Sequence, residues 1–367
     1  MKKLVKIKNI ASYSKGSQIN GDELMENAEY DYLNGGIKPS GRWNETNCEA
    51  NTVTISEGGN SCGYVNYMSK PFWCGAHCYY LFETVKNTRY LYYALKSQQN
   101  RIMKLRSGAC MPNIKKVDLG NFEFIFDDDE SEQDKVTSIL SGIEKIITIS
   151  KREVQLLDDL VNARFVEVFG DPVLNEKGWK IKPLSDMGNC KNGMNFRYDD
   201  CGVEINCLGV GDFKDLSVID NTQMLSTVSL NEMPSEEYML KDDDIVFVRS
   251  NGNKALVGRS VAVYPGNIPT TFSGFCIRYR KYDDRITIPY LLRVLKTDSI
   301  RSKMTGRGAN IQNLNQQILG ALPIPVPPVE LQKRFADFCH QITKSKLILK
   351  NHHFERGILS GDKFFIS

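Results

Sequence analysis

Apolar residues recur at intervals of three and four from Ser131 to Phe169, a segment without proline. This spacing places the apolar side chains along one face of an α-helix. The stripe consists of Val136, Ile139, Leu140, Ile143, Ile146, Ile147, Val154, Leu157, Leu160, Val161, Phe165 and Val168. Gly170-Asp171-Pro172 follows, and glycine leaves a helix readily while proline cannot continue one. The pattern predicts one long helix with an apolar seam.

A second helix with an apolar stripe is predicted from about Val329 to the C-terminal end. Its apolar positions are Leu331, Phe335, Phe338, Ile342, Leu349 and later Ile358 or Leu359. The stretch 322–328 before it is rich in proline, which favours an extended connector. Each helix is about 50 Å long if it has roughly 35 residues. Neither helix has enough apolar partners within its own sequence to bury its seam. We therefore expect the two seams to pack against each other.

The rest of the chain alternates short β-prone runs with glycine and asparagine, which predicts mixed α and β structure. The clearest strand candidates are Thr52-Val53-Thr54-Ile55, Cys78-Tyr79-Tyr80-Leu81-Phe82, Asp244-Ile245-Val246-Phe247-Val248 and Phe275-Cys276-Ile277-Arg278-Tyr279.

The two halves of the chain repeat each other. Identical residues stand two hundred positions apart without a gap at Tyr90/Tyr290, Leu91/Leu291, Leu95/Leu295, Lys96/Lys296, Arg101/Arg301, Gly108/Gly308, Ala109/Ala309, Asn113/Asn313, Leu119/Leu319 and Gly120/Gly320. After one deletion Gln133 matches Gln332 and Ile143 matches Ile342. A period this long is outside the range of solenoid repeats, so each unit should be a domain.

The predicted fold is therefore α+β, with two similar globular domains joined by two long helices that pack as an antiparallel coiled coil about a pseudo-twofold axis. We place the first globular domain at 1–128, the central helix at 129–170, the second globular domain at 171–328 and the C-terminal helix at 329–367. The globular domains would then lie at opposite ends of a rigid rod.

Charge adds a second shared feature. The chain has 47 basic and 44 acidic residues and a net charge of +3, which says little. However, 89–116 contains basic residues and no acidic ones, and its counterpart 289–317 has one aspartate. Two basic segments at equivalent positions favour a phosphate backbone as ligand over a merely solvated helix face. The candidate residues are Lys96, Arg101, Lys104, Arg106 and Lys115 in the first segment and Lys296, Arg301, Lys303 and Arg307 in the second.

Two polar loops follow predicted strands at comparable places, 57–61 and 249–253. Arginine and asparagine can make bidentate hydrogen bonds to base edges, and glycine lets a backbone approach the groove. A plain hairpin turn is an equally good interpretation of either loop alone. Arg249, Ser250 and Asn251, with the matched pair Asn113 and Asn313, complete the candidate DNA-binding residues.

Catalytic signals are weak. The chain has no GxxxxGK[ST], HExxH or GxGxxG motif, and four histidines. The triplets 127–129 and 242–244 could bind a metal, but acidic triplets are usually solvated loops. Cys74, His77 and Cys78, with Cys48 and Cys62, could form a zinc site, although buried free cysteines explain their spacing better.

No apolar run could span a bilayer and no export signal begins the chain, so we expect a cytoplasmic location.

Three segments resemble the specificity subunits of type I restriction-modification enzymes: 321–332 (ALPIPVPPVELQ), 163–172 (ARFVEVFGDP), and 247–252 (FVRSNG) with Phe272-Ser273-Gly274. Pro71-Phe72-Trp73, with His77, is similar to the counterpart in the first domain. The resemblance covers almost the whole chain.

The resemblance implies that each globular part is a target recognition domain for one half of a split double-stranded DNA site, and that the helices fix the gap. It also implies docking of modification subunits, and through them restriction subunits. S-adenosylmethionine, ATP and Mg would then be bound by those partners, and this chain would bind no cofactor and catalyse nothing. The alternatives are a coiled-coil scaffold, a specificity component of another methylation-linked assembly, and a self-sufficient methyltransferase or nuclease.

Overall fold

The computed structural model describes residues 1–84, 87–108, 112–196, 201–213, 217–305 and 313–354. They form two compact units, unit 1 built on residues 1–151 and unit 2 on residues 152–351. The division falls within helix α4 (Glu130–Phe169). The predicted domain boundaries at 128/129 and 328/329 stand next to the first residues of α4 and of α8 (Val329–Phe354).

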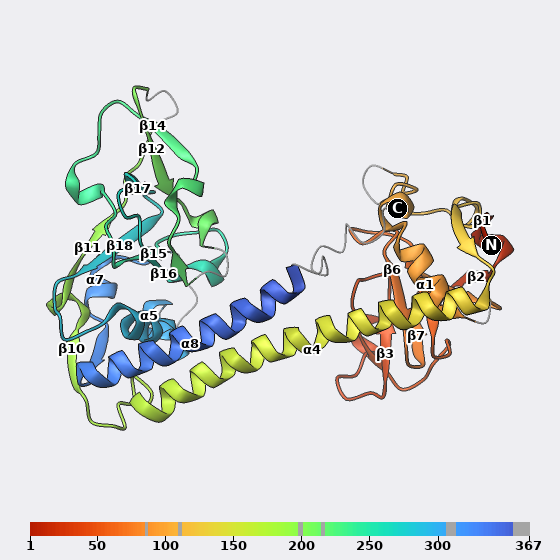
Figure 1. The fold of residues 1–367 in the computed structure, drawn as a ribbon, viewed down its shortest axis with the longest axis horizontal. Helices are drawn as coiled ribbons and strands as arrows, with labels where there is room; N and C mark the ends of the chain where they lie inside the picture. Colours follow the sequence, from red (N-terminus) through yellow and green to blue (C-terminus); the bar gives the residue numbers. More distant parts are fainter. Residues whose placement is uncertain (85–86, 109–111, 197–200, 214–216, 306–312, 355–367) are drawn as a thin grey trace. The chain divides into compact units, whose positions relative to one another are not determined.

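Unit 1 contains two small sheets and a paired strand (Figure 1). The four-stranded sheet runs β2 (Ser12–Lys15), β8 (Cys78–Phe82), β5 (Thr52–Ser56), β6 (Val65–Met68), and the three-stranded sheet runs β4 (Gly41–Trp43), β3 (Tyr30–Leu33), β7 (Phe72–Cys74). Strand β1 (Lys2–Lys6) pairs antiparallel with β9 (Glu123–Asp127). The helices are α1 (Thr88–Lys96), α2 (Gln99–Met103), α3 (Lys116–Gly120) and the first part of α4.

Unit 2 repeats this topology strand for strand. Its larger sheet runs β11 (Gly188–Asn192), β18 (Cys276–Lys281), β15 (Asp244–Val248), β16 (Ser260–Val263), with β13 (Val218–Ile219) added at the edge. The smaller sheet runs β14 (Thr227–Leu230), β12 (Val203–Leu208), β17 (Thr270–Phe272). Helices α5 (Ile288–Lys296), α6 (Asp298–Thr305), α7 (Gln316–Gly320) and α8 follow the order of α1 to α4. The predicted duplication is confirmed.

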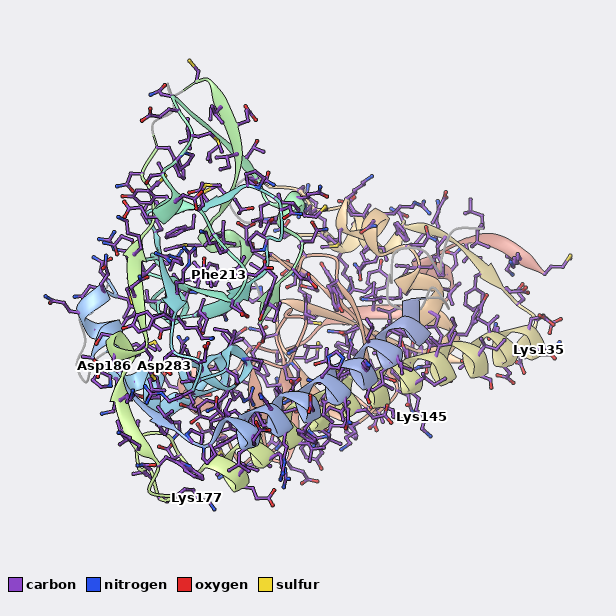
Figure 2. The ribbon with its side chains drawn as sticks, turned by 60° about the vertical axis from the view of Figure 1, so that its left-hand side comes forward. Lys135, Lys145, Lys177, Asp186, Phe213 and Asp283 are labelled. Carbon is purple, nitrogen blue, oxygen red and sulfur yellow. The ribbon has the colours of Figure 1, made fainter. Side chains whose placement is uncertain are left out.

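Alternation along the central strand sets the core of each unit, because successive side chains point to opposite faces of a sheet. In β15, Ile245 and Phe247 pack with α5, whereas Val246 and Val248 pack in a second core that contains Phe213 (Figure 2). In β5, Val53 and Ile55 join the main core of unit 1. The other face of β5 carries buried Thr52, Thr54 and Ser56 instead. Unit 1 is thus more polar between its two sheets.

The proline-rich stretch before α8 is part of a sheet. Strand β19 (Pro323–Val326) pairs antiparallel with β10 (Lys180–Pro183), and Ile324 is fully buried. The predicted extended conformation is therefore confirmed, and the pairing with β10 is a feature that the sequence analysis did not predict. Prolines are tolerated here because a two-stranded ladder leaves each strand with an edge that needs no donor.

Within unit 2, the end of α4 packs antiparallel on α8. The rings of Phe165 and Phe335 lie 5.6 Å apart. Eleven residues further along α8 and seven residues back along α4, Lys346 pairs with Asp158. The antiparallel packing of the two seams is confirmed for this part of the helices. Ile358, Leu359 and the rest of 355–367 lie outside the described residues, and the rigid rod and its pseudo-twofold axis stay predictions.

Two matched glutamines, Gln133 and Gln332, stabilise the first turns of the long helices by hydrogen bonds. The Gln133 amide donates to the Asp127 carbonyl (2.6 Å), and the Gln332 amide donates to the Pro327 carbonyl (2.8 Å). Both side chains are buried. The Gln133/Gln332 match in the sequence therefore reflects one structural role, a hydrogen bond that ties each helix to the strand before it.

Candidate nucleic-acid interface

The two polar loops occupy equivalent places in the units. The Ile114 amide donates to the Glu57 carbonyl (2.9 Å), and the Leu314 amide donates to the Arg249 carbonyl (2.8 Å). Asn113 forms an isolated backbone β-bridge with Gly58, and Asn313 forms the equivalent β-bridge with Ser250. Each loop joins antiparallel neighbours, β5 to β6 and β15 to β16, and is too long for a two-residue hairpin turn. Each loop thus lies against the segment that carries the matched asparagine.

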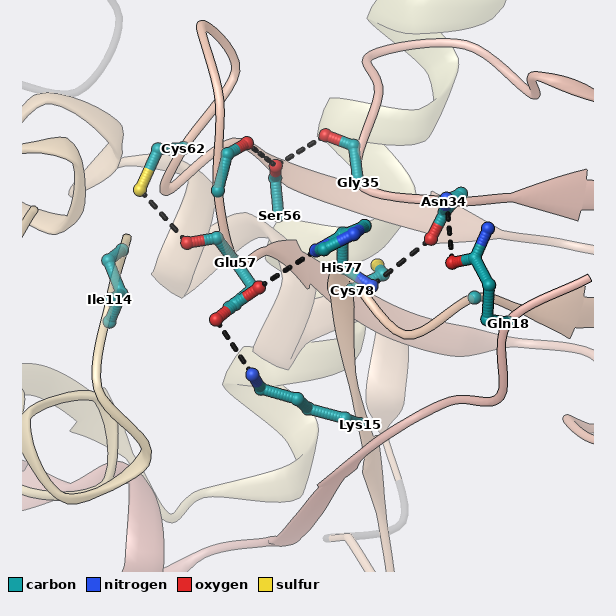
Figure 3. Close-up of polar contacts among 12 residues, drawn as sticks. Lys15, Gln18, Asn34, Gly35, Ser56, Glu57, Cys62, His77, Cys78 and Ile114 are labelled. Atoms are coloured by element: carbon teal, nitrogen blue, oxygen red, sulfur yellow. Dashed lines mark hydrogen bonds and ion pairs between the residues drawn. The ribbon is translucent and has the colours of Figure 1, made fainter. Parts of the chain in front are cut away.

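In unit 1 the Glu57 carboxylate contacts a lysine and a histidine side chain at the end of β5 (Figure 3). Glu57 Oε1 accepts from Lys15 Nζ (2.7 Å), and Oε2 lies 3.3 Å from His77 Nδ1. The Glu57 side chain is 11% exposed, whereas those of Lys15 and His77 are 44% and 59% exposed. A buried carboxylate needs such partners, since its desolvation is otherwise costly. Glu57 therefore holds two exposed donors in place.

Hydrogen bonds of the Ser56, Ser61 and Cys62 side chains hold the backbone of this loop in place. Ser56 and Ser61 both donate their hydroxyls to the Gly35 carbonyl, and the Cys62 thiol lies 3.1 Å from the Glu57 carbonyl. Burial raises the pKa of Cys62, with a smaller contribution from Glu57. The thiol thus stays protonated as a weak donor. The loop is consequently a rigid support for the side chains at its rim.

The predicted DNA-binding residues of unit 1 divide into two groups. Lys104, Arg106, Asn113 and Lys115 are exposed. The Arg101 guanidinium is also exposed but donates to Gln98 Oε1 (2.6 Å) and to the Glu123 carbonyl (3.2 Å). Ser107 pairs through its backbone with Asn113, which bridges Gly58, so the basic segment borders the loop after β5.

In unit 2 the predicted residues surround the loop after β15. Arg249 Nη1 donates to the Gly274 carbonyl (3.2 Å), and Asn251 Oδ1 accepts from the Asn253 amide (2.8 Å). Lys303 and Asn313 are exposed, and Ser250 is half-buried. Arg301 donates to the Val257 carbonyl (3.0 Å), and burial lowers its pKa. Arg307 lies outside the described residues.

Lys96 and Lys296 are held inside their units at matched positions. Lys96 Nζ donates to the Val65 carbonyl (2.9 Å) and to Gln99 Oε1 (3.0 Å), and Lys296 Nζ donates to Ser217 Oγ (2.7 Å). Burial lowers the pKa of each to about 8. An ammonium group engaged in this way is less suited to a phosphate contact than the exposed cations. A DNA-binding role for these two lysines stays a prediction.

We expect Lys96 and Lys296 to add a contribution to the free energy of unfolding that rises with pH between about 8 and about 9.5. Both lysines have a folded-state pKa of about 8, against an ordinary value of 10.5. At these two sites the unfolded chain binds more protons than the folded chain in this window, so their contribution to stability grows as the pH rises. Buried cysteines such as Cys62 and Cys207 act in the opposite direction, because burial raises their pKa in the folded chain while the thiols of the unfolded chain ionise. Urea unfolding at several pH values measures the slope.

The double variant Lys96→Met and Lys296→Met should have a lower slope of unfolding free energy against pH than the wild-type chain, because the opposing contribution of the cysteines is the same in both. Lys145→Met is the matched control, because Lys145 is an exposed lysine on α4 (Figure 2). Equal slopes in the wild-type chain and the double variant would contradict the assignment of the two depressed pKa values.

The cysteines considered for zinc are buried free thiols: Cys48, Cys62, Cys74 and Cys78. Contacts with the Cys48 and Cys78 thiols, together with burial, raise the pKa of Cys74. Among the described residues, no group of three or more His, Cys, Asp or Glu side chains is arranged to hold a metal ion.

The acidic triplets are only partly solvated: Asp128, Asp129, Asp242 and Asp243 are exposed, Asp127 is half-buried and Asp244 is buried. Asp244 is fully buried and forms two 2.7 Å hydrogen bonds with Arg280. In the first triplet, Asp127 pairs with the N-terminal amine, and Asp129 Oδ1 accepts from the Ser131 amide (3.0 Å) at the start of α4. Asp244 therefore holds two strands of unit 2 together, and Asp127 and Asp129 hold the N-terminus and the start of α4.

Sequence reasoning missed the grouping of Lys15, Glu57 and His77. These residues stand far apart in the chain and meet only because β2, β5 and β8 are neighbours in one sheet. The position of the loop after β5 was the one available signal. Phe275, predicted within a strand, instead stands just before β18 and is 61% exposed.

None of the helices in the described part of the chain combines the length and apolar content needed to cross a membrane.

Known proteins share this sequence and fold. A protein assigned as a type I specificity subunit in Mycoplasma genitalium is 32% identical over 166 residues, 43% of each chain. The StySPI specificity subunit of Salmonella potsdam is 28% identical over 310 residues, 76% of this chain and 64% of the relative. The chain thus matches less than two thirds of either relative's length.

A crystal structure of the S subunit of a type I restriction-modification system from M. genitalium has the same fold. It superposes with a TM-score of 0.63 over 100% of this chain and 95% of that chain, at 22% identity. The family model described as type I restriction modification DNA specificity domain matches residues 2–158 and 176–355, one match for each half of the duplication. With nearly its whole length matched in this way, the chain belongs to the type I restriction-modification DNA specificity family.

Proposed function

We propose that this chain is the DNA-sequence specificity subunit of a type I restriction-modification system. Unit 1 reads one half of a bipartite double-stranded target and unit 2 reads the other. The chain itself is noncatalytic. Modification subunits dock on it and supply S-adenosylmethionine and methyl transfer, and restriction subunits join through them with ATP and Mg.

The observation that carries this proposal is the repeated interface. In both units a strand-end loop and an asparagine that forms a backbone β-bridge to it occupy equivalent places, and exposed basic residues lie in the segment that carries this asparagine. Side chains with donors in fixed positions suit base edges, and the exposed cations suit phosphates. A scaffold without DNA function would need none of these features twice.

The proposal is tested by co-expressing the chain with the modification subunit of its system and mapping methylated bases in the host DNA. We expect a split motif with a fixed gap. Replacing residues 1–128 with the same domain of a relative should change one half of the motif and leave the other intact. A complex that methylates without sequence preference would contradict the proposal, and failure to form a complex would favour the scaffold.

The exposed basic residues of unit 1 should account for part of the salt dependence of binding. We expect Lys104→Gln with Arg106→Gln to make the slope of log K against log salt shallower by about 2, since each lost phosphate contact removes about 0.9. The measurement is a salt titration of duplex binding by the assembled complex. Lys145→Gln with Lys177→Gln removes the same charge elsewhere (Figure 2) and should leave the slope unchanged. Equal slopes for both double variants would argue against the basic segment.

A further inference from the structure

Both units expose a ring at the same backbone position. The Glu57 amide donates to the His77 carbonyl (2.9 Å), and at the equivalent place the Arg249 amide donates to the Phe275 carbonyl (2.8 Å). The His77 side chain is 59% exposed and Phe275 is 61% exposed. A single exposed ring is ordinary on a protein surface. Two rings at matched positions, each next to the strand-end loop, suggest a shared role.

The surroundings of Phe275 are polar and hydrogen-bonded. Its carbonyl accepts from the Arg249 amide, and its own amide donates to Ser273 Oγ (3.3 Å). Asn313 bridges Ser250 on the same loop. The benzyl ring itself can make no hydrogen bond, so it stands as an apolar group among donors and acceptors. In the major groove of DNA the one apolar group on a base edge is the 5-methyl of thymine.

His77 occupies the equivalent place with different chemistry (Figure 3). Its backbone amide donates to Asn34 Oδ1 (3.1 Å), and its Nδ1 faces the Glu57 carboxylate. Since an ionised carboxylate only accepts, Nδ1 carries a proton, and Nε2 remains for another partner. Glu57 is therefore a positioning residue that fixes the ring plane. Lys15, on the other oxygen of Glu57, adds a second exposed donor.

We propose that this ring position discriminates bases in each unit: Phe275 packs on a thymine 5-methyl group in one half-site, and His77, oriented by Glu57, hydrogen-bonds to a base edge in the other. The proposal rests on the proposed function. It also implies different contacts at the equivalent step, because a benzyl ring makes apolar contact alone whereas an imidazole needs a hydrogen-bonding group on a base edge.

The test uses the complex of the full chain with its modification subunits and a duplex that carries the methylated motif. Each thymine of either strand in the half-sites is replaced singly by deoxyuridine, which removes only the methyl group. We expect one replacement to weaken wild-type binding by about fourfold, the effect of losing one buried methyl. The Phe275→Ala complex should bind the thymine and uracil duplexes equally.

Tyr282→Ala is the matched control, because Tyr282 is a similarly exposed ring of unit 2 at 63%. It should retain the wild-type ratio. His77→Ala should relax selectivity at one base pair of the opposite half-site and keep the thymine preference. A Phe275→Ala complex that still prefers the methyl group, or a wild-type complex indifferent to every replacement, would overturn the inference. A wild-type complex that does not prefer the motif over a shuffled duplex would instead overturn the proposed function.

Discussion

Replacing Phe165 with alanine should lower the free energy of unfolding by about 3–5 kcal/mol, the usual cost of removing a large buried ring. Phe165 is 2% exposed and lies where α4, α5 and α8 meet. Its ring centroid is 5.2 Å from that of Phe169, 5.6 Å from Phe335 and 6.0 Å from Tyr290. A cavity at this point cannot close easily, because three elements converge on it. Urea unfolding of the full chain measures the loss.

Phe275→Ala provides the matched control for this prediction. It removes the same ring from a site that is 61% exposed, so it should change stability by less than about 0.5 kcal/mol. Phe165→Leu should recover part of the loss, since it refills some of the volume. Equal stabilities of Phe165→Ala and Phe275→Ala would show that the aromatic cluster does not hold α8 against α4.

The long helices and the duplication could be predicted because their signals are local or repeated. An apolar seam at intervals of three and four can be recognised within the sequence of a single helix. Matched residues such as Gln133 and Gln332 keep their register in both units. The strand-end loops were found for the same reason. By contrast, the proline-rich stretch 322–328 gave no sign of its partner, because β10 lies far away in sequence.

The candidate interface was less accessible to sequence analysis. A lysine looks the same in a pattern whether it is exposed, as Lys104 is, or held by a carbonyl, as Lys96 is. Burial depends on residues from other strands, such as Val65 of β6. The cluster around Glu57 likewise needs the neighbouring strands to be known. Charge patterns therefore indicate the candidate segments, and tertiary contacts decide which of their cations are exposed.

Asp244→Asn should destabilise unit 2 by about 3–5 kcal/mol, because it breaks a buried ion pair from one side. The Asp244 carboxylate is fully buried, and both of its oxygens accept from Arg280 at 2.7 Å. Arg278, 4% exposed in its side chain, lies 4.0 Å away. Burial lowers the pKa of Arg278, and Arg280 lowers it further. Without the carboxylate, two neighbouring guanidinium groups would share a poorly solvated site.

The neighbouring Asp242→Asn is the control for urea unfolding. Asp242 is exposed, and its Oδ1 accepts from the Gly266 amide (2.9 Å), a bond that asparagine can keep. A change of less than about 0.5 kcal/mol is expected. Loss of stability in both variants to the same degree would mean that the triplet acts as a unit and that burial of Asp244 is not the cause.

A second substitution separates the lost attraction from the unpaired charge. Arg278→Met removes the more deeply buried of the two guanidinium groups while keeping an unbranched apolar stem of similar length. If the uncompensated charge causes the damage, Arg278→Met should cost less in the Asp244→Asn background than in the wild-type chain, and the double variant should be more stable than Asp244→Asn alone. Additive losses would show that Arg280 alone accounts for the role of Asp244, and that Arg278 is held by its packing between the sheets.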